Sequence, residues 1–226
     1  MLSSKKTFYF IIIALFLGSC GSPSDDVTTD ADLSSTQEDF PIDYHSYSNV
    51  YDVYTAHLHL DINVDFDAKV ISGSVKHDIV NKSEVNQMVF DVHSLKIDKV
   101  MLDETDEATF VIGEEDELLG APLTVDIEKE TQTVTIFFET TTNSDALQWL
   151  EPQQTADKSS PYLFTQGQAI LTRTWIPCQD TPGNRITYSA NVHVPTNLMA
   201  VMSADNPTER SATGDYSFEM KNPIPS

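Results

Sequence analysis

The stretch Gln166–Gly183, QGQAILTRTWIPCQDTPG, begins with a pair of glutamines, Gln166 and Gln168, and places an arginine, an aspartate and one cysteine around a tryptophan. A thiol becomes a catalytic nucleophile only when a positioned base activates it, and the histidine that follows nearest in sequence is His193, on a predicted strand. Because Cys178 lies between Pro177 and a turn, we expect it to be structural. Glutamine amides instead orient ligands by hydrogen bonds. The stretch is either a catalytic unit or one wall of a binding site.

Two other groups of side chains have metal-binding character. His57 and His59 share one face of a predicted strand, and a His-x-His pair can supply two zinc ligands. No cysteine or third histidine is near in sequence and the rest of that face is Asp and Asn, so we expect a solvated face. The acidic runs Asp103–Glu107 and Glu114–Glu117 lack the ligand spacing and turn glycine of a calcium loop, so we expect solvated turns and no metal site.

The remaining enzyme and binding signatures give little support for other functions. Trp149 and Trp175 can be read as a sugar-binding platform, but aromatic residues in an all-β chain are usually core. No Gly-x-Ser-x-Gly elbow or His-Glu-x-x-His motif is present, and catalytic carboxylates cannot be selected among 35 acidic residues. The formal net charge of −22 and the absence of a phosphate-binding glycine loop argue against nucleotides and nucleic acids as partners. We therefore expect no catalytic residue in this chain.

The N-terminus has the pattern of a targeting segment. Lys5 and Lys6 precede the apolar run Phe8–Leu17, which is shorter than the ~20 residues of a membrane-spanning helix. The run ends in LGSC, which resembles the bacterial lipoprotein cleavage box, with Cys20 as the lipidated residue. We expect residues 1–19 to be a lipoprotein signal peptide and Cys20 to anchor an exported protein to a membrane, in the periplasm or at the outer surface. The alternative is a plain signal peptide with a chance cysteine.

The chain after Cys20 divides into a tether and one domain. Residues 21–42 carry several acidic side chains, no basic one and few large apolar ones, so residues 20–42 are predicted to be a flexible tether. From residue 43 the hydrophobic period becomes two: HLHLDINVDF, TVTIFFE and ITYSANVHV each alternate apolar and polar residues. HLHLDINVDF reads as a half-buried antiparallel strand.

About ten short strands are predicted across residues 43–226, with no sustained helical stripe. Besides the three alternating segments, strand-like runs lie near residues 70–80, 88–92, 95–102, 109–112, 123–127, 198–203 and 216–220. The fold class is therefore all-β, a saddle-like sandwich of packed, mostly antiparallel sheets.

The same central stretch carries a family resemblance. TQGQAILTRTWIPCQDTP is similar to a signature near the end of the N-terminal β-domain of the aminopeptidase N family of zinc metallopeptidases, and ALQWLEPQQTADKSSPYLF resembles its leukotriene hydrolase branch. YSANVHVPTNLMAVMSA also resembles that branch, and the final NPIPS resembles the point where the β-domain hands over to the catalytic domain. The resemblance covers about residues 58–226.

The resemblance implies exopeptidases that remove N-terminal residues from peptides, with a zinc-activated water as nucleophile. Their zinc ligands, general base and oxyanion-stabilising tyrosine have no match here, so zinc is implied only for a longer parent with a catalytic domain in the same chain. Gln166, Gly167, Gln168 and Ala169 match the loop that lines the substrate's N-terminal end, and Gln168 sits where other members meet the α-amine. The matches at Arg173, Pro177, Cys178, Asp180 and Pro182 are read as structural.

Two functions remain compatible with these sequence features. The first is the N-terminal substrate-binding domain of an exported zinc aminopeptidase, in which this chain is a truncated form that lacks the zinc site and is inactive alone. The alternative is a stand-alone surface lipoprotein whose β-domain is a binding or interaction module.

Overall fold

The computed structural model describes residues 42–226, and these residues form strands with two short 3-10 helices. The predicted signal peptide, Cys20 and all but the last residue of the predicted tether lie outside the described residues. The strands are β1 Val53–Asp65, β2 Val70–Asn81, β3 Gln87–Val92, β4 Leu95–Leu102, β5 Asp106–Glu107, β6 Phe110–Ile112, β7 Ala121–Asp126, β8 Thr133–Thr140, β9 Leu147–Leu150, β10 Tyr162–Thr165, β11 Ile186–His193 and β12 Asp215–Ile224. The 3-10 helices are η1 Pro152–Gln154 and η2 Thr172–Thr174.

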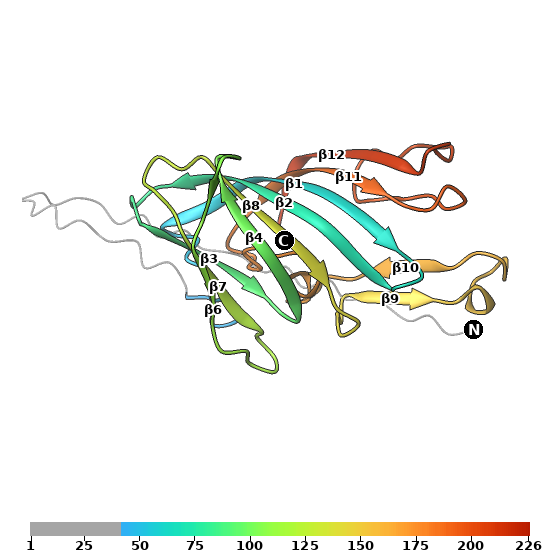
Figure 1. Cartoon of the computed structure of the whole chain (residues 1–226), viewed down its shortest axis with the longest axis horizontal. Coiled ribbons are helices and arrows are strands. Elements are labelled where there is room, and N and C mark those ends of the chain that lie inside the picture. Colours follow the sequence, from blue (N-terminus) through green and yellow to red (C-terminus); the bar gives the residue numbers. More distant parts are fainter. Residues whose placement is uncertain (1–41) are drawn as a thin grey trace, which may run out of the picture. The chain divides into compact units, whose positions relative to one another are not determined.

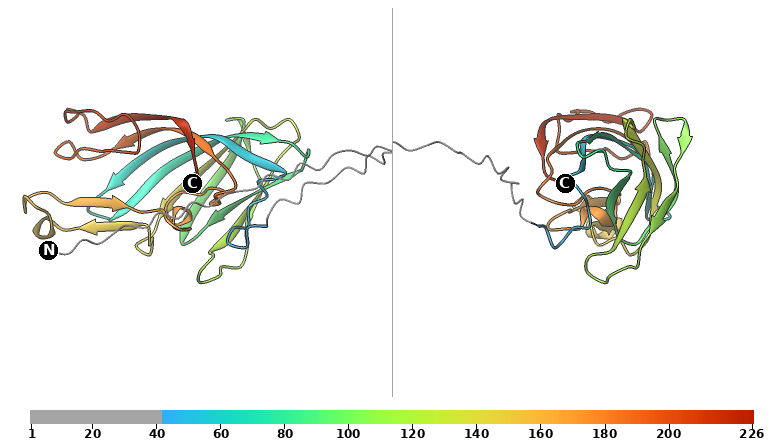
Figure 2. Two further views of the ribbon diagram at one scale, coloured as in Figure 1. Left: turned by 180° about the vertical axis from the view of Figure 1, so that it is seen from behind. Right: turned by 90° about the vertical axis from the view of Figure 1, so that its left-hand side faces the viewer.

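The strands form three sheets. The largest has seven strands in the order β12-β11-β1-β2-β8-β4-β5, and most of them lie side by side in Figure 1. A three-stranded sheet has the order β3-β7-β6, and β9 and β10 form a separate hairpin. The right-hand view of Figure 2 shows the large sheet curving around an interior. The all-β class with mostly antiparallel packed sheets is confirmed.

The core lies between the sheets and follows the predicted alternation. On β1 the apolar positions Leu58, Leu60, Ile62 and Val64 are buried, while His57 and His59 lie on the opposite face. The alternating apolar residues of β8 and β11 are buried in the same way, and they meet buried residues of β3 and β7 from the smaller sheet. Period-two patterning thus places one face of each strand in the core.

The pairing of β1 differs in part from the prediction. β1 pairs antiparallel with β2, as expected, but on its other side it pairs parallel with β11, with His57 opposite Thr187 and Asn63 opposite His193. Parallel neighbours need a long connection, and the whole segment from β2 to β10 supplies it. Alternation within β1 reports which face is buried but not the direction of either neighbour.

The predicted strand at 198–203 was wrong. The segment is irregular, with local turns such as the bond from the Leu198 amide to the Pro195 carbonyl (2.8 Å). Its alternation is still real, because Leu198 and Met202 pack against the core. The carbonyl of Leu198 accepts a bond from the Tyr216 hydroxyl (3.1 Å), so side chains rather than a neighbouring strand satisfy part of its backbone.

His77 on β2 follows the same period and is therefore buried in the core. Its Nδ1 lies 3.1 Å from the Thr55 hydroxyl, and its ring centroid lies 4.7 Å from that of Phe90. Nε2 makes no hydrogen bond of ordinary geometry in the described residues. Burial lowers the pKa of His77 to about 3, and the nearby carbonyl of Pro177 only partly opposes that shift.

The buried imidazole should make stability fall with acidification. The unfolded chain binds a proton on His77 near pH 6.5, whereas the folded chain does so only near the lowered pKa of about 3. The contribution is therefore present above about pH 6.5 and is lost as pH falls, by about 1.4 kcal/mol per pH unit. Urea unfolding at about pH 7 and about pH 4.5 should show a larger loss in the wild type than in His77→Leu.

The His77→Leu variant also controls for the effect of buried carboxyl groups on the pH dependence of stability. Burial raises the pKa of Asp91 and Asp180, with Arg173 opposing, so these carboxyl groups change stability with pH in the opposite direction. Both carboxyl groups are present in both proteins, and their contribution cancels in the difference. Equal losses in the wild type and in His77→Leu would show that His77 does not set the acid sensitivity.

Candidate functional site

The loop Gln166–Ala169 begins where β10 ends and is open to solvent. β9 and β10 pair antiparallel up to Leu147 and Thr165, and the Gln166 amide extends the ladder with a bond to the Ala146 carbonyl (2.9 Å). Gln166, Gln168 and Ala169 are exposed, whereas Gly167 is half-buried. The loop therefore leaves a hydrogen-bonded hairpin at a fixed point and presents its glutamines outward.

The two glutamines of this loop have different surroundings. The side chain of Gln166 turns back on the loop, where its Oε1 accepts a long hydrogen bond from the backbone amide of Gln168 (3.4 Å). The side-chain amide of Gln168 makes no hydrogen bond within residues 42–226. The peptide bond between Gln168 and Ala169 is cis. Gln168 therefore offers one exposed carbonyl and two N–H groups to a ligand.

Glycine is favoured at position 167 for a steric reason that the sequence alone did not reveal. A Cβ at this position would lie 2.3 Å from the hydroxyl oxygen of Thr172 in η2. The Gly167 carbonyl accepts a bond from the Leu171 amide (2.8 Å), which closes the turn onto η2. The glycine thus lets the loop lie directly against η2. No signal in one sequence separates this close approach from an ordinary turn glycine.

Below the loop, Arg173 holds several segments together. Its side chain is fully buried, and its Nε donates to Asp180 Oδ2 (3.1 Å). Nη1 donates to the Leu119 carbonyl (2.8 Å) and lies 3.7 Å from Asp91 Oδ1, while Nη2 donates to the His45 carbonyl (2.8 Å). The guanidinium joins the N-terminal segment, the loop before β7, β3 and the turn after η2. The structural interpretation of Arg173 and Asp180 agrees with this geometry.

Asp91 extends the same network from β3. Its carboxylate accepts bonds from the Ser46 hydroxyl (2.6 Å) and from the amides of Tyr47 (2.7 Å) and Asp180 (3.0 Å). Its backbone amide donates to the Cys178 carbonyl (2.7 Å). Sequence reasoning did not single out Asp91, because an aspartate in an alternating run carries no signal of burial.

Cys178 is not positioned as a nucleophile. The thiol is buried, and burial together with the nearby carboxylates of Asp180 and Asp91 raises its pKa well above the usual value. His193 does not contact it, because that imidazole is exposed on the outer face and pairs with Asp215 (Nδ1 to Oδ1, 2.6 Å). The stretch Gln166–Gly183 therefore carries no thiol catalytic unit in the described structure.

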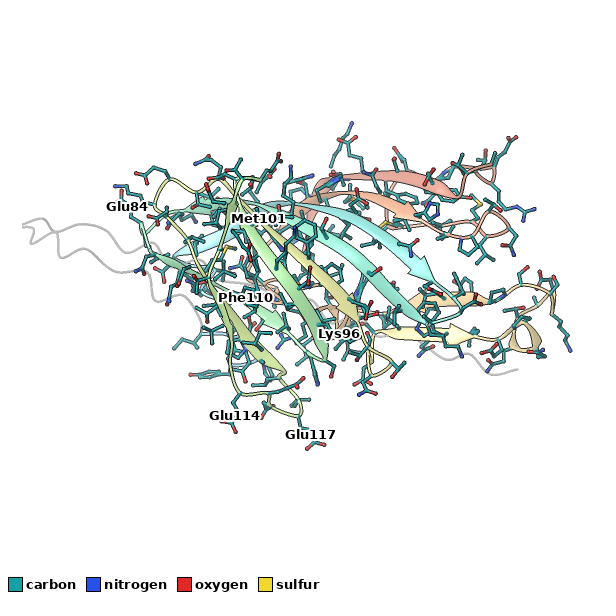
Figure 3. The ribbon with its side chains drawn as sticks, in the orientation of Figure 1. Glu84, Lys96, Met101, Phe110, Glu114 and Glu117 are labelled. Carbon is teal, nitrogen blue, oxygen red and sulfur yellow. The ribbon has the colours of Figure 1, made fainter. Side chains whose placement is uncertain are left out.

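The remaining sequence candidates are dispersed. Trp149 and Trp175 are partly buried against the core, and Trp149 meets the Phe66 ring edge-on at 5.3 Å between centroids. Glu114 and Glu117 are exposed, and Figure 3 shows them pointing outward near a loop tip. Between residues 42 and 226, no group of three or more His, Cys, Asp or Glu side chains is arranged to hold a metal ion.

The Gln166–Ala169 loop is a surface rather than an enclosed pocket. A hollow of about 460 Å³ in the described part of the chain is lined by residues from 205–217 and does not include the loop. Tyr162 and Phe164 on β10 are 49% and 42% exposed, so apolar area lies beside the loop. In the same part of the chain, no helix has the length and apolar character to cross a membrane.

Comparisons with known proteins agree on one family. Residues 46–226 match the peptidase M1 N-terminal domain. Leukotriene A-4 hydrolase of Xenopus laevis is 38% identical over 181 residues, and leucine aminopeptidase 2 of Kluyveromyces lactis is 38% identical over 186 residues. Alignment with these two relatives covers 75% and 81% of this chain but only 30% and 28% of theirs. The chain thus spans less than a third of the length of the curated relatives it matches.

Solved structures give the same result. Yeast LTA4 hydrolase in complex with bestatin superposes with a TM-score of 0.76 at 32% identity, covering 84% of this chain and 30% of that one. An M1 zinc metallopeptidase from Deinococcus radiodurans, at 19% identity and a TM-score of 0.58, shares the fold over 77% of this chain and 40% of its own. The family resemblance of the central stretch is confirmed.

Removing the Arg173 guanidinium should strongly destabilise the domain. Arg173→Met leaves the buried carboxylates of Asp91 and Asp180 without their cation, and loss of one partner of a buried ion pair costs about 3–5 kcal/mol. Arg173→Lys keeps the charge but loses the planar fork, so we expect an intermediate loss. Urea unfolding measures both free energies.

Lys96→Met is the matched control for this prediction. Lys96 pairs with Glu139 at the surface (2.5 Å), and exposed pairs contribute about 1 kcal/mol or less. If Arg173→Met and Lys96→Met lower the free energy of unfolding equally, the buried network is not the anchor of the loop.

Proposed function

The chain belongs to the peptidase M1 N-terminal domain family, and we propose that it forms the substrate-binding wall of an exported zinc aminopeptidase that removes N-terminal residues from peptides. The observation that carries this proposal is the exposed Gln166–Ala169 loop, whose Gln168 side-chain amide makes no hydrogen bond within residues 42–226 while Arg173 fixes the base of the loop. A leucine aminopeptidase among the relatives supports the reaction class.

The amide of Gln168 has the chemistry to orient a peptide's free N-terminus. Its Oε1 accepts a hydrogen bond from the α-ammonium group, and such charge-assisted bonds are stronger than neutral ones. Gln168 adds no charge of its own, so it orients the substrate more than it attracts it. Attraction comes instead from the formal net charge of −22, which favours cationic partners.

Zinc in such an enzyme would polarise the scissile carbonyl and supply an activated water. Residues 42–226 do not fit that role, because no three suitable ligands converge among them. In this proposal the zinc is held by a catalytic domain of the same parent protein. The residues of this chain bind the substrate and hold its N-terminal end in place.

Changing Gln168 should weaken substrate binding in the parent enzyme, this domain together with its zinc-binding domain. In Gln168→Ala, loss of a bond to a charged group should lower kcat/KM for an aminoacyl-arylamide about tenfold or more, mainly through KM. Gln168→Glu should instead lower KM for the same substrate, because it adds a negative charge beside the ammonium.

Gln153→Ala is the control for this measurement. Gln153 is also an exposed glutamine, and it lies in η1 at the opposite end of the β9–β10 hairpin. Equal kinetics for Gln168→Ala and Gln153→Ala would remove Gln168 from the substrate site. A parent protein that binds no zinc and cleaves no arylamide would overturn the proposed function itself and favour a binding module.

We also propose that Cys20 carries the lipid anchor of the mature protein. The support is the sequence alone: a basic start, a short apolar run and the LGSC box ending at Cys20. Multiple acyl chains on one cysteine give stable anchoring, whereas one chain binds only marginally.

Cys20→Ala should move the protein from the membrane fraction to the soluble export fraction. Fractionation followed by immunoblotting measures the change, and Cys178→Ala is the control because that buried thiol lies inside the domain. Unchanged membrane association of Cys20→Ala would exclude this anchor.

A further inference from the structure

Two imidazoles and a hydroxyl converge on the outer face of the seven-stranded sheet. His57 and His59 project from β1, and Ser189 lies opposite His59 on the parallel strand β11. The Ser189 oxygen lies 2.9 Å from His57 Nε2 and 2.8 Å from His59 Nδ1. Both ring nitrogens therefore lie within hydrogen-bond distance of the same oxygen atom, and this keeps them close to each other.

The other nitrogen of His57 is also fixed. Nδ1 lies 2.8 Å from the hydroxyl of Thr187, which is the residue opposite His57 on β11. When Nδ1 donates its hydrogen to this hydroxyl, Nε2 presents its lone pair toward Ser189. Metal-binding histidines are commonly oriented in this way, with the second ring nitrogen donating to a neighbour.

A carboxylate lies in the same row of the sheet. Glu219 on β12 is opposite Ser189, so the row across three strands reads His59, Ser189, Glu219. Glu219 pairs with Lys221 at 3.3 Å, and both side chains are more than half exposed. Exposed pairs of this kind interact weakly, so Glu219 adds negative charge to the row of residues that contains His59.

The charges around the pair suit a cation. Asp78 lies opposite His57 on β2, and Asp61 follows His59 on the same face of β1. The nearest base, Lys76 opposite His59, is paired with Glu104 at 3.1 Å.

We propose that His57 and His59 form a two-histidine surface site for a divalent transition metal ion, with water as the remaining ligands. The ion replaces the hydrogen bonds that both rings make to Ser189 and binds the lone pairs of His57 Nε2 and His59 Nδ1, with His59 in the tautomer that carries its hydrogen on Nε2. Imidazole suits zinc and copper, and bonds of about 2.0–2.1 Å to zinc require only a small separation of the two nitrogens.

The test is metal binding by the purified full chain carrying Cys20→Ser, which removes the thiol outside the described residues. Titration with Cu²⁺ followed by electron paramagnetic resonance should show one bound ion with hyperfine coupling to two nitrogens. Calorimetry with Zn²⁺ should give the same stoichiometry. His57→Gln and His59→Gln should each weaken binding about tenfold or more, and Glu219→Gln should weaken it less.

Two variants separate this site from adventitious binding. His193→Gln removes another exposed histidine of the same face and should leave affinity unchanged. Ser189→Ala should keep or tighten binding, because the metal ion replaces the hydroxyl. Circular dichroism and thermal unfolding show that each variant is folded.

Absence of a stoichiometric ion, or equal affinity in the wild type and in both histidine variants, would overturn the proposal. A loss of affinity in Glu219→Gln as large as that in the histidine variants would overturn the assignment of the site to the two histidines alone. Neither result bears on the proposed peptidase function, since residues 166–169 remain intact in every variant.

Discussion

The buried guanidinium of Arg173 is the constraint on which the candidate site depends. A charge with no solvent contact must be balanced, and here Asp180 and Asp91 supply the balance while the carbonyls of Leu119 and His45 take further N–H groups. The Arg173 carbonyl itself accepts a bond from the His93 amide (3.0 Å), at the end of β3. Because these partners come from segments far apart in sequence, the guanidinium can be satisfied only when the segments are in place. The position of the loop above it follows from that requirement.

The loop combines a rigid base with a free side chain, which is what a binding wall requires. η2 packs directly on Gly167, and the hairpin ladder fixes the loop at Gln166. Little conformational entropy then remains to be lost in the backbone when a ligand binds, so the contact that we propose for Gln168 would be preorganised. The exposure of Gln166, Gln168 and Ala169 is consistent with this division, because one wall is not a pocket.

The sequence predicted faces of strands well and neighbours of strands poorly. Alternation in β1, β8 and β11 identified their buried residues, because the period of two is a local property. The parallel pairing of β1 with β11 depends on contacts across most of the chain, and no local pattern encodes it. The segment 198–203 shows the reverse error: its alternation is genuine, yet tyrosine hydroxyls replace the partner strand. For the site, the motif pointed to Gln166–Ala169, whose role in substrate binding stays a prediction, and the part of Asp91 in the buried network required the fold.

Histidines on the neighbouring strands β1 and β2 have different surroundings, because the period-two alternation places one of them in the core and the others on the outer face. His77 falls on the inward phase of β2, where burial lowers its pKa to about 3 and where Nε2 makes no hydrogen bond of ordinary geometry in the described residues. His57 and His59 fall on the outward phase of β1, where hydroxyls of β11 hold their rings. A shift of β2 by one residue would expose His77 and bury Lys76, an uncompensated charge in the core. The register of the sheet is therefore fixed by its polar residues as well as its apolar ones, and the same register is what brings Ser189 between the two outer imidazoles.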